Sequence, residues 1–267
     1  MTTETGQVRP ADVWQKADSA KKFLDQAALE LASVKKELDE MLRVSVGSHV
    51  LDVGCGTGND VRAIAERVGP TGRVVGLDSS AELIAGATPA GPGAAPVEFL
   101  HGQAGALPFG DDTFDAARAE RVIEHVPDPG AAVAEMLRVV KPGGQVLITD
   151  PDHGLWAPDL ADRELTRTLM NWWSDHVPNP WVARRLRGLF ARAGAVDITL
   201  RLQPVVLTSL ASADSLTWIG KTAAVAGAQG IVDEAAARAW GEEILGRDAE
   251  GSFLMFGTFV VVSGFKK

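Results

Sequence analysis

A cluster of glycines follows a short apolar run and precedes a helical pattern. Residues 50–53 read VLDV, residues 54–58 read GCGTG, and the next apolar run, RVVGL at 73–77, ends directly before Asp78. Glycines permit a tight turn and let the backbone approach a ligand closely, with the N–H groups of the following helix facing it. The distance to Asp78 is typical of a carboxylate that accepts hydrogen bonds from both hydroxyls of a ribose. The spacing predicts a nucleotide-binding loop.

The position of the third glycine separates two classes of nucleotide. The dinucleotide fingerprint G-x-G-x-x-G needs its third glycine where this chain has Asn59. The loop reads G-x-G-x-G instead, from Gly54 to Gly58. A nicotinamide-dependent oxidoreductase is therefore the less favoured interpretation.

Two groups of side chains could accept a proton from a substrate. His125 follows the fourth apolar run, and Asp152 with His153 follows the fifth. Because an imidazole titrates near neutral pH, His125 is the first candidate for a general base, and Asp152 with His153 is the second. A structural or substrate-contact role stays open for all three, since some acceptors need no base.

The single cysteine and the histidines predict neither a nucleophile nor a metal site. Cys55 lies inside the glycine loop without a partner base in the sequence, so we expect it to fill space. No pair of residues among the following four histidines has a recognised metal-ligand spacing: His101, His125, His153 and His176.

Five apolar runs alternate with helical patterns in the first part of the chain. The runs are residues 50–53, 73–77, 97–100, 114–119 and 145–149. Runs without polar alternation are typical of strands covered on both faces, and repeated strand, helix, strand order predicts parallel pairing with right-handed crossovers. Ser79 and Glu82 have the spacing of a capping box at the start of one helix.

Two more strands, near 195–203 and at 252–264, complete a predicted doubly wound, mostly parallel seven-stranded α/β sheet. Helical patterns cover residues 20–42 and about 160–175, 181–193, 213–227 and 232–245. We therefore expect an N-terminal helical arm at 1–46, a nucleotide-binding core at 47–150, and the rest of the sheet with an inserted helical cover at 151–267.

All seven tryptophans lie outside residues 49–150. Helix packing explains some of them, but as a group they predict part of the lining of an apolar pocket. The aromatic residues expected to contact a substrate are Trp14, Phe23, Trp156, Trp172 and Trp173.

The composition argues against several classes of protein. With 26 basic and 35 acidic side chains the formal charge is -9, which argues against nucleic acid or anionic lipid as a partner. One cysteine cannot form an intrachain disulfide, and we find neither a signal-peptide pattern nor a membrane-length apolar stretch. We expect a cytoplasmic protein with a small-molecule substrate, and a homo-oligomer stays open.

With Asp52 two positions before the first glycine, the loop resembles motif I of class I S-adenosylmethionine-dependent methyltransferases. The resemblance continues through Asp78, HGQAGALPFGDDTFD at 101–115 and EMLRVVKPGG at 135–144. The chain is most similar to the UbiE-like and natural-product small-molecule types, which carry LPF-x-D-x-x-FD and EH-V-x-DP segments. The resemblance implies the Rossmann-like methyltransferase fold.

The same resemblance implies a set of cofactor contacts. Asp52, Gly54 and Gly56 would hold the methionine part of S-adenosylmethionine, and Asp78 its ribose. Gln103 and Ala104 would flank the adenine; the family usually has an aspartate in place of Gln103, so this uncharged contact should be weaker. The other expected cofactor residues are Cys55, Ser79, Glu120 and Arg121, of which Arg121 could meet a carboxylate or serve in a salt bridge.

The implied reaction is methyl transfer from S-adenosylmethionine to an oxygen, nitrogen or carbon atom of an apolar small molecule, with S-adenosylhomocysteine as the product. Such chemistry depends mainly on alignment and exclusion of water. We expect a role in natural-product biosynthesis. The alternative is a protein that binds S-adenosylmethionine without methyl transfer, as a binding module or a catalyst of a rearrangement.

Overall fold

The computed structural model describes Ala27 and residues 30–267. Trp14, Phe23 and the start of the predicted helix at 20–42 lie outside these residues. The chain divides into two compact units, which we describe separately. The core unit comprises Val34–Pro151, Trp181–Gln203 and Phe259–Lys267, and the helical unit comprises Asp152–Pro180, Pro204–Thr258 and the described residues before Val34.

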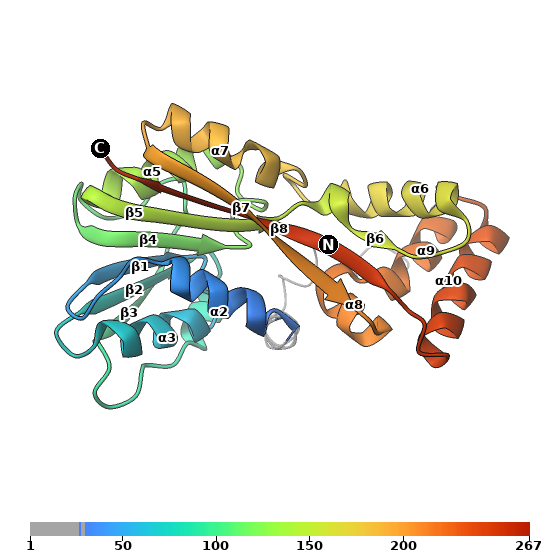
Figure 1. The fold of residues 1–267 in the computed structure, drawn as a ribbon, viewed down its shortest axis with the longest axis horizontal. Coiled ribbons are helices and arrows are strands. Elements are labelled where there is room, and N and C mark those ends of the chain that lie inside the picture. The colour runs from blue at the N-terminus through green and yellow to red at the C-terminus, as the bar shows by residue number, and fades with distance from the viewer. Residues whose placement is uncertain (1–26, 28–29) are drawn as a thin grey trace. The chain divides into compact units, whose positions relative to one another are not determined.

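The sheet of the core unit pairs β1 to β5 in parallel, as predicted (Figure 1). Its strands follow one another as β3, β2, β1, β4, β5 and β8, with β8 antiparallel to β5 and β7 paired to β8. Their bounds are β1 His49–Val53, β2 Arg73–Asp78, β3 Val97–His101, β4 Phe114–Glu120, β5 Val140–Pro151, β7 Val196–Leu207 and β8 Met255–Phe265. Because β1 is central and β2 and β4 flank it, the residues after these three strands gather at one edge of the sheet.

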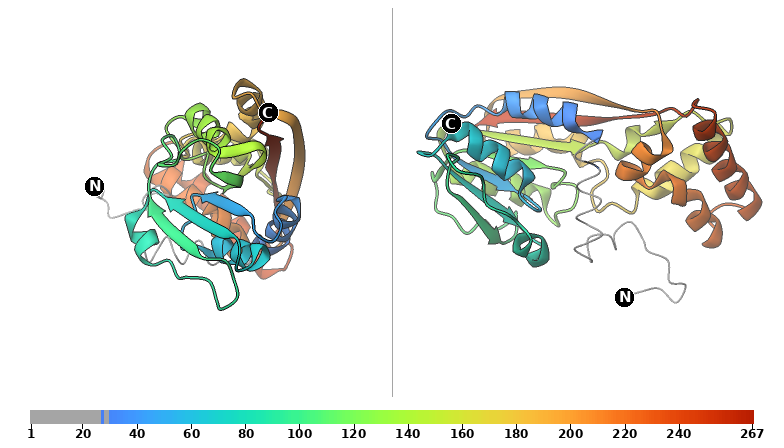
Figure 2. Two further views of the ribbon diagram at one scale, coloured as in Figure 1. Left: turned by 90° about the vertical axis from the view of Figure 1, so that its left-hand side faces the viewer. Right: turned by 90° about the horizontal axis from the view of Figure 1, so that it is seen from below.

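Helices cover both faces of this sheet (Figure 2). Alternate strand residues such as Leu51 and Val53 belong to the buried cluster that also contains residues of α5 Pro129–Val139 and α7 Val182–Arg192. On the opposite face lie α2 Ala32–Met41 and α3 Asn59–Val68 (Figures 1 and 2). Val50 is apolar there, but its neighbour in that row, Asp52, brings a charge into the interior.

Local sequence explains where two of the helices of the core unit begin. Asp128 accepts hydrogen bonds from the N–H groups of the first turn of α5, and Pro129 occupies its first position, where no N–H is needed. In α4, Ala81–Ala85, the capping residue is Ser80, whose hydroxyl accepts from the N–H of Leu83. The predicted capping by Ser79 is therefore wrong by one residue.

The helical unit contains most of the segment predicted as a cover. Its elements are the 3-10 turn η2 His153–Leu155, β6 Ala157–Pro158, α6 Arg163–Ser174, α8 Leu210–Thr217, α9 Ile219–Ala228 and α10 Glu234–Ala249. The indole N–H of Trp240 on α10 donates to Thr166 Oγ1 on α6 at 2.9 Å, which satisfies a polar group in an apolar interior. Trp240 therefore stabilises the packing within this unit.

One predicted helix, at 213–227, is two helices. Trp218 adopts a left-handed backbone between α8 and α9, with φ of 58°. The carboxylate of Asp214 accepts a hydrogen bond from the N–H of Gly220 at 2.6 Å, so it caps the second helix from within the first. The apolar pattern of residues 213–227 runs without a break and does not indicate the hydrogen bond from Gly220 to Asp214 that separates the two helices.

The prediction of a doubly wound, mostly parallel α/β sheet is confirmed, but the sheet has eight strands rather than seven. The additional strand, β6, pairs over only two residues with the start of β8. The division at residues 46/47 and 150/151 stays a prediction. Within residues 30–267 we find no helix that is long and apolar enough to cross a membrane.

A substitution of Phe190 tests the packing between α7 and the sheet. Its ring is fully buried and lies so close to Gly264 of β8 that an added Cβ there would come within 2.8 Å of it. We expect Phe190→Ala to lower the free energy of unfolding by about 3–5 kcal/mol, because it leaves a cavity. Urea denaturation measures the change. The exposed neighbour on the same helix provides the control: Arg187→Ala should stay within about 0.5 kcal/mol of wild type.

Candidate functional site

The glycine loop between β1 and α3 is a tight turn whose residues are buried or half-buried. Gly54, Gly56 and Gly58 have φ of 72°, 55° and 81°, a backbone region that side chains disfavour. A Cβ at Gly54 would overlap the side chain of Val122, which follows β4. The N–H of Gly54 donates to the carbonyl of Leu77 on β2 at 2.6 Å, so the loop is tied to both neighbouring strands.

Asp78 at the end of β2 holds this loop. Its Oδ2 accepts from the N–H of Gly56 and its Oδ1 accepts from the N–H of Ser80, both at 2.8 Å. A carboxylate oxygen has two lone pairs, so each oxygen keeps one for a further donor. The half-buried carboxylate is thus oriented and still able to bind two vicinal hydroxyls.

The residues predicted to border the adenine lie beyond β3. Gln103 is exposed and pairs with Ala106 in a small turn, whereas Ala104 is buried against the core cluster. Ser79 is exposed, and its carbonyl lies 3.1 Å from His101 Nε2. The structure brings these three residues to the same edge of the sheet as Asp78, and their contact with a cofactor stays a prediction.

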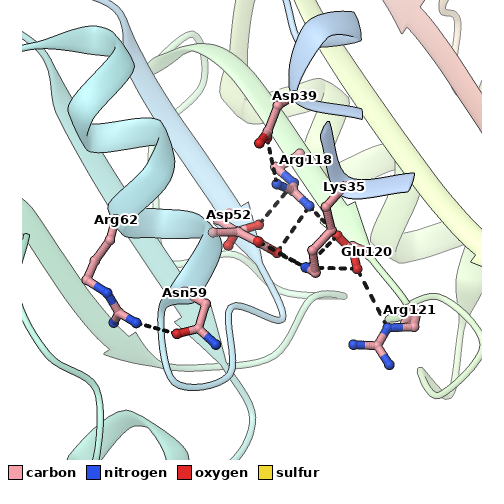
Figure 3. Close-up of polar contacts among 9 residues, drawn as sticks. Lys35, Asp39, Asp52, Asn59, Arg62, Arg118, Glu120 and Arg121 are labelled. Atoms are coloured by element: carbon pink, nitrogen blue, oxygen red, sulfur yellow. Dashed lines mark hydrogen bonds and ion pairs between the residues drawn. The ribbon is translucent and has the colours of Figure 1, made fainter. Parts of the chain in front are cut away.

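A charge cluster lies beneath the glycine loop on the face of α2 and α3 (Figure 3). Its centre is Arg118, 3% exposed, on β4 directly beside Asp52 of β1 in the strand register. Arg118 Nη2 donates to Glu120 Oε2 at 2.7 Å and lies 3.3 Å from Asp60 Oδ2, and Arg118 Nε lies 3.6 Å from Asp52 Oδ1. Asp52 therefore faces an arginine of its own sheet.

Helix α2 contributes two further members to the charge cluster. Lys35 Nζ bridges Asp60 Oδ2 at 2.7 Å and Glu120 Oε1 at 3.0 Å, and Asp39 Oδ1 lies 3.6 Å from Arg118 Nη1. These pairs join α2, α3 and β4 through residues far apart in the sequence. Sequence analysis did not find Lys35, Asp39 or Asp60, because charges on helices are usually solvated. It did not find Arg118 either, which lies within the apolar run of β4.

Burial and charge move the pKa values of the cluster in opposite directions. Desolvation raises the pKa of Asp52 to about 7, and the positive charge of Arg118 only partly opposes it. Desolvation also acts on Asp60, but Arg118 and Lys35 outweigh it and lower that pKa to about 2. The surrounding carboxylates raise the pKa of Arg118 above its usual range. Near neutral pH, Asp52 is the member that exchanges a proton.

Arg121 follows β4 in a left-handed backbone conformation, with φ of 56°. Its N–H donates to the carbonyl of Thr149 at 2.9 Å, which holds the strained residue in place. Its guanidinium Nε is buried without a hydrogen-bond partner among the described residues and lies 3.7 Å from Glu120 Oε1. A buried donor without an acceptor is costly, so the geometry leaves Arg121 able to bind an anion.

Asp150 is a buried acid that sequence analysis missed. It lies at the end of β5 with no exposed surface, and its Oδ1 accepts from the N–H of Glu124 at 3.3 Å. Glu124 is 4% exposed, and its Oε1 lies 3.4 Å from Nε2 of the predicted base His125. Desolvation, followed by the charge of Glu124, raises the pKa of Asp150 well above its usual range. Its position directly after the apolar run at 145–149 could have indicated it as a site residue.

The other predicted site residues lie in the helical unit. Asp152 is buried and accepts from the N–H of Gly154 at 3.1 Å, and the ring of His153 lies 5.1 Å from that of Trp173. Trp156 is buried against Gly257, where an added Cβ would overlap its ring. Trp172 is half-buried and meets the ring of His176 edge-on at 4.5 Å. The structure thus brings the predicted second base next to predicted substrate aromatics.

The cysteine is unsuited to nucleophilic chemistry. Cys55 is buried in the glycine loop, and desolvation, with the charges of Asp52 and Asp78, raises the pKa of its thiol. Across Ala27 and residues 30–267, no group of three or more His, Cys, Asp or Glu side chains is arranged to hold a metal ion.

Comparison with known proteins assigns this geometry to a family. Residues 51–148 match a family model described as a methyltransferase domain. Over 243 residues the chain is 32% identical to the uncharacterised 37.1 kDa protein of transposon TN4556 from Streptomyces fradiae, covering 90% of this chain and 69% of that one. The chain belongs to the class I S-adenosylmethionine-dependent methyltransferases.

Other known proteins are similar to part or most of the chain. The chain is 43% identical over 115 residues to the demethylmenaquinone methyltransferase of Bacillus cytotoxicus. The matched region covers 42% of this chain and 48% of that protein, so the match spans about half the length of this relative. The solved YcgJ protein of Bacillus subtilis has the same fold, with a TM-score of 0.58, 19% identity, and coverage of 88% and 98% of the two chains. The predicted family is confirmed.

The raised pKa of Asp52 predicts that the stability of the methyltransferase depends on pH. Its pKa is raised to about 7 by burial, so between about pH 4 and 7 the folded state holds a proton that the unfolded chain has lost, and stability falls as the pH rises. In Asp52→Asn this loss is absent. The variant's free energy of unfolding, measured by urea titration at several pH values, should rise relative to wild type by up to about 1.4 kcal/mol per pH unit in that window.

The exposed acid Glu66 on α3 is the matched control for this measurement. Glu66→Gln should show the same pH dependence as wild type. Parallel curves for wild type and Asp52→Asn between about pH 4 and 7 would mean that Asp52 is ionised throughout.

Proposed function

We propose that this methyltransferase binds S-adenosylmethionine at the glycine loop and transfers its methyl group to an oxygen, nitrogen or carbon atom of an apolar small molecule in natural-product biosynthesis. The observation that carries the proposal is the carboxylate of Asp78, oriented by Gly56 and Ser80 with a lone pair left on each oxygen. S-adenosylmethionine would supply a methyl group on a positively charged sulfur, which needs little activation.

The residues present fit this cofactor at both ends. Gly54 has no room for a Cβ beside Val122, so the loop packs tightly against the segment after β4. Arg121 has a buried Nε without an acceptor, which suits the carboxylate of the methionine part. The charge cluster contains four carboxylates, of which Asp52 exchanges a proton near neutral pH, and two cations, Lys35 and Arg118; this excess of carboxylates suits the ammonium group of the methionine part.

The remaining predicted contacts belong to the same proposal. Cys55, Ser79, Gln103 and Ala104 would border the cofactor, and His125 would serve as the base where the acceptor must lose a proton. Asp152 and His153 are the second choice of base. Trp156, Trp172 and Trp173, with Trp14 and Phe23 outside the described residues, would meet the apolar acceptor.

A cytoplasmic location, the absence of nucleic-acid and membrane partners, and a homo-oligomer rest on the composition alone and stay proposals. The alternative of cofactor binding without methyl transfer is separated by product analysis. Isothermal titration calorimetry with S-adenosylmethionine tests binding, and no heat at millimolar cofactor would overturn the proposal. Formation of S-adenosylhomocysteine with an apolar acceptor distinguishes transfer from binding alone.

Asp78→Ala should weaken binding of S-adenosylmethionine by about 1–3 kcal/mol, because the buried hydroxyl donors lose their acceptor. Calorimetry measures the affinity. Asp111→Ala, which removes an exposed acid from a loop, should bind as wild type does. Equal affinities of Asp78→Ala and wild type would remove Asp78 from the ribose site.

Arg121→Met should weaken binding of S-adenosylhomocysteine by about 1.5–3 kcal/mol, the range for a hydrogen bond to a charged group. It should leave 5′-methylthioadenosine unaffected, because that ligand lacks the amino-acid end. Arg73→Met, which removes an arginine that pairs with Glu98 at the surface, controls for the loss of positive charge. An equal loss for both ligands would assign Arg121 to the structure of the loop rather than to the carboxylate.

A further inference from the structure

A glutamate and an arginine on α5 form a two-pronged ion pair. Arg138 Nε donates to Glu135 Oε1 at 2.7 Å, and Arg138 Nη2 donates to Glu135 Oε2 at 2.8 Å, so the planar guanidinium binds both carboxylate oxygens. Such a pair fixes the geometry of both side chains as well as their charge. Their mutual hydrogen bonds lower the pKa of Glu135 and raise the pKa of Arg138, so both stay charged near neutral pH.

This pair binds main-chain groups of the segment that follows β3. Glu135 Oε2 also accepts from the N–H of Leu107 at 2.7 Å. Arg138 Nη2 donates to the carbonyl of Leu107 at 3.1 Å, and Arg138 Nη1 donates to the carbonyl of Phe109 at 2.8 Å. Three main-chain groups outside α5 are thus held by two side chains that lie three residues apart on one helix.

Leu107 directly follows the turn that is predicted to border the adenine. Gln103 and Ala106 pair across this turn, where the N–H of Ala106 donates to the carbonyl of Gln103 at 3.1 Å. The side chains of Ala104 and Leu107 belong to the buried core cluster. The place of the turn is therefore fixed by apolar contacts and by the ion pair on α5.

The middle of the turn has main-chain donors available to a ligand. The N–H groups of Ala104 and Gly105 donate to no other group of the described chain. Adenine presents an acceptor, its ring nitrogen N1, whereas hypoxanthine carries a proton on N1. The amide of Gln103 can turn over to suit either base, but a main-chain N–H can only donate. Discrimination between the two bases therefore depends on where the main chain of the turn lies.

We infer that Glu135 and Arg138 are positioning residues for the adenine end of the cofactor, because they hold the main chain next to the turn at 103–106 and so place the N–H groups that select adenine over hypoxanthine. The inference rests on the proposed function, since it needs S-adenosylmethionine at this edge of the sheet. The two side chains act through the main chain of the segment rather than by contact with the base.

A second pair of the same kind offers a matched control in the helical unit. Arg247 Nε donates to Glu243 Oε1 at 2.9 Å, and the same oxygen accepts from the N–H of Ala161 at 2.9 Å. None of the predicted cofactor contacts lies in this unit. Arg247→Lys therefore disturbs an arginine–glutamate pair that also holds a main-chain N–H, but at a place without the adenine turn.

Calorimetry of the full chain with S-adenosylhomocysteine and S-inosylhomocysteine, in which hypoxanthine replaces adenine, measures the preference for adenine. We expect wild type to bind the adenine ligand about five- to hundredfold more tightly, the range for a donor left without its acceptor. Arg138→Lys keeps the charge but loses the planar fork, and Glu135→Ala removes the acceptor of Leu107. Each should lower this preference by about two- to tenfold, and Arg247→Lys should keep the wild-type preference.

The ratio of the two affinities separates positioning from loss of stability. A fraction of unfolded protein lowers both affinities by the same factor and leaves their ratio unchanged. Where Glu135→Ala fails to fold, Glu135→Gln takes its place, because it keeps an oxygen for the N–H of Leu107 but loses the ion pair, and it should also lower the preference.

The outcomes also separate this inference from the proposed function. An unchanged preference in Arg138→Lys or in the Glu135 variant would overturn the positioning role. Equal affinity of wild type for the two ligands would overturn it as well, and in both cases the binding of S-adenosylhomocysteine would leave the proposed function intact. No heat with either ligand would remove both proposals.

Discussion

The close approach of Gly54 to Val122 is the constraint on which the rest of the site depends. No side chain fits between them, so the loop after β1 and the segment after β4 meet through main chain and one valine. Asp78 ties the same loop to β2 through the N–H of Gly56. Three adjacent strand ends are thereby held together, and the carboxylate of Asp78 at this edge is fixed by two main-chain N–H groups. Such preorganisation is what a transfer reaction that depends on alignment requires.

Two groups of buried acids flank this edge, and they differ in how their charge is balanced. Around Arg118 each carboxylate has a cation nearby, and the pKa of Asp60 falls to about 2 in consequence. At the ends of β4 and β5, Asp150 is surrounded by main-chain N–H groups and a second acid, and its pKa rises. The first arrangement keeps Asp60 charged in the interior, although burial still raises the pKa of Asp52 to about 7.

Membership of the family and the shared fold indicate which cofactor the protein uses, but they do not indicate which acceptor it methylates. Residues 51–148 match the methyltransferase domain, and the similarity to the demethylmenaquinone methyltransferase of Bacillus cytotoxicus covers 42% of the chain. The helical unit carries Trp156, Trp173 and Trp240 in its interior, so at least part of its tryptophan serves packing. Function on a shared fold is set by the variable segments, so we propose that residues outside the glycine loop select the acceptor.

Local patterns of the sequence determined the strands, the glycine loop and the position of Asp78, because hydrophobic runs and left-handed glycine conformations depend on neighbouring residues. The family followed from the same 49–150 segment. Other features depend on residues that are distant in the chain. Lys35 meets Asp60 and Glu120 only after α2 has packed on the sheet, and Asp150 meets Glu124 only because β4 and β5 are neighbours. Only tertiary structure decided which charges are buried and which are paired, since desolvation and charge compensation arise when distant segments exclude water from one another.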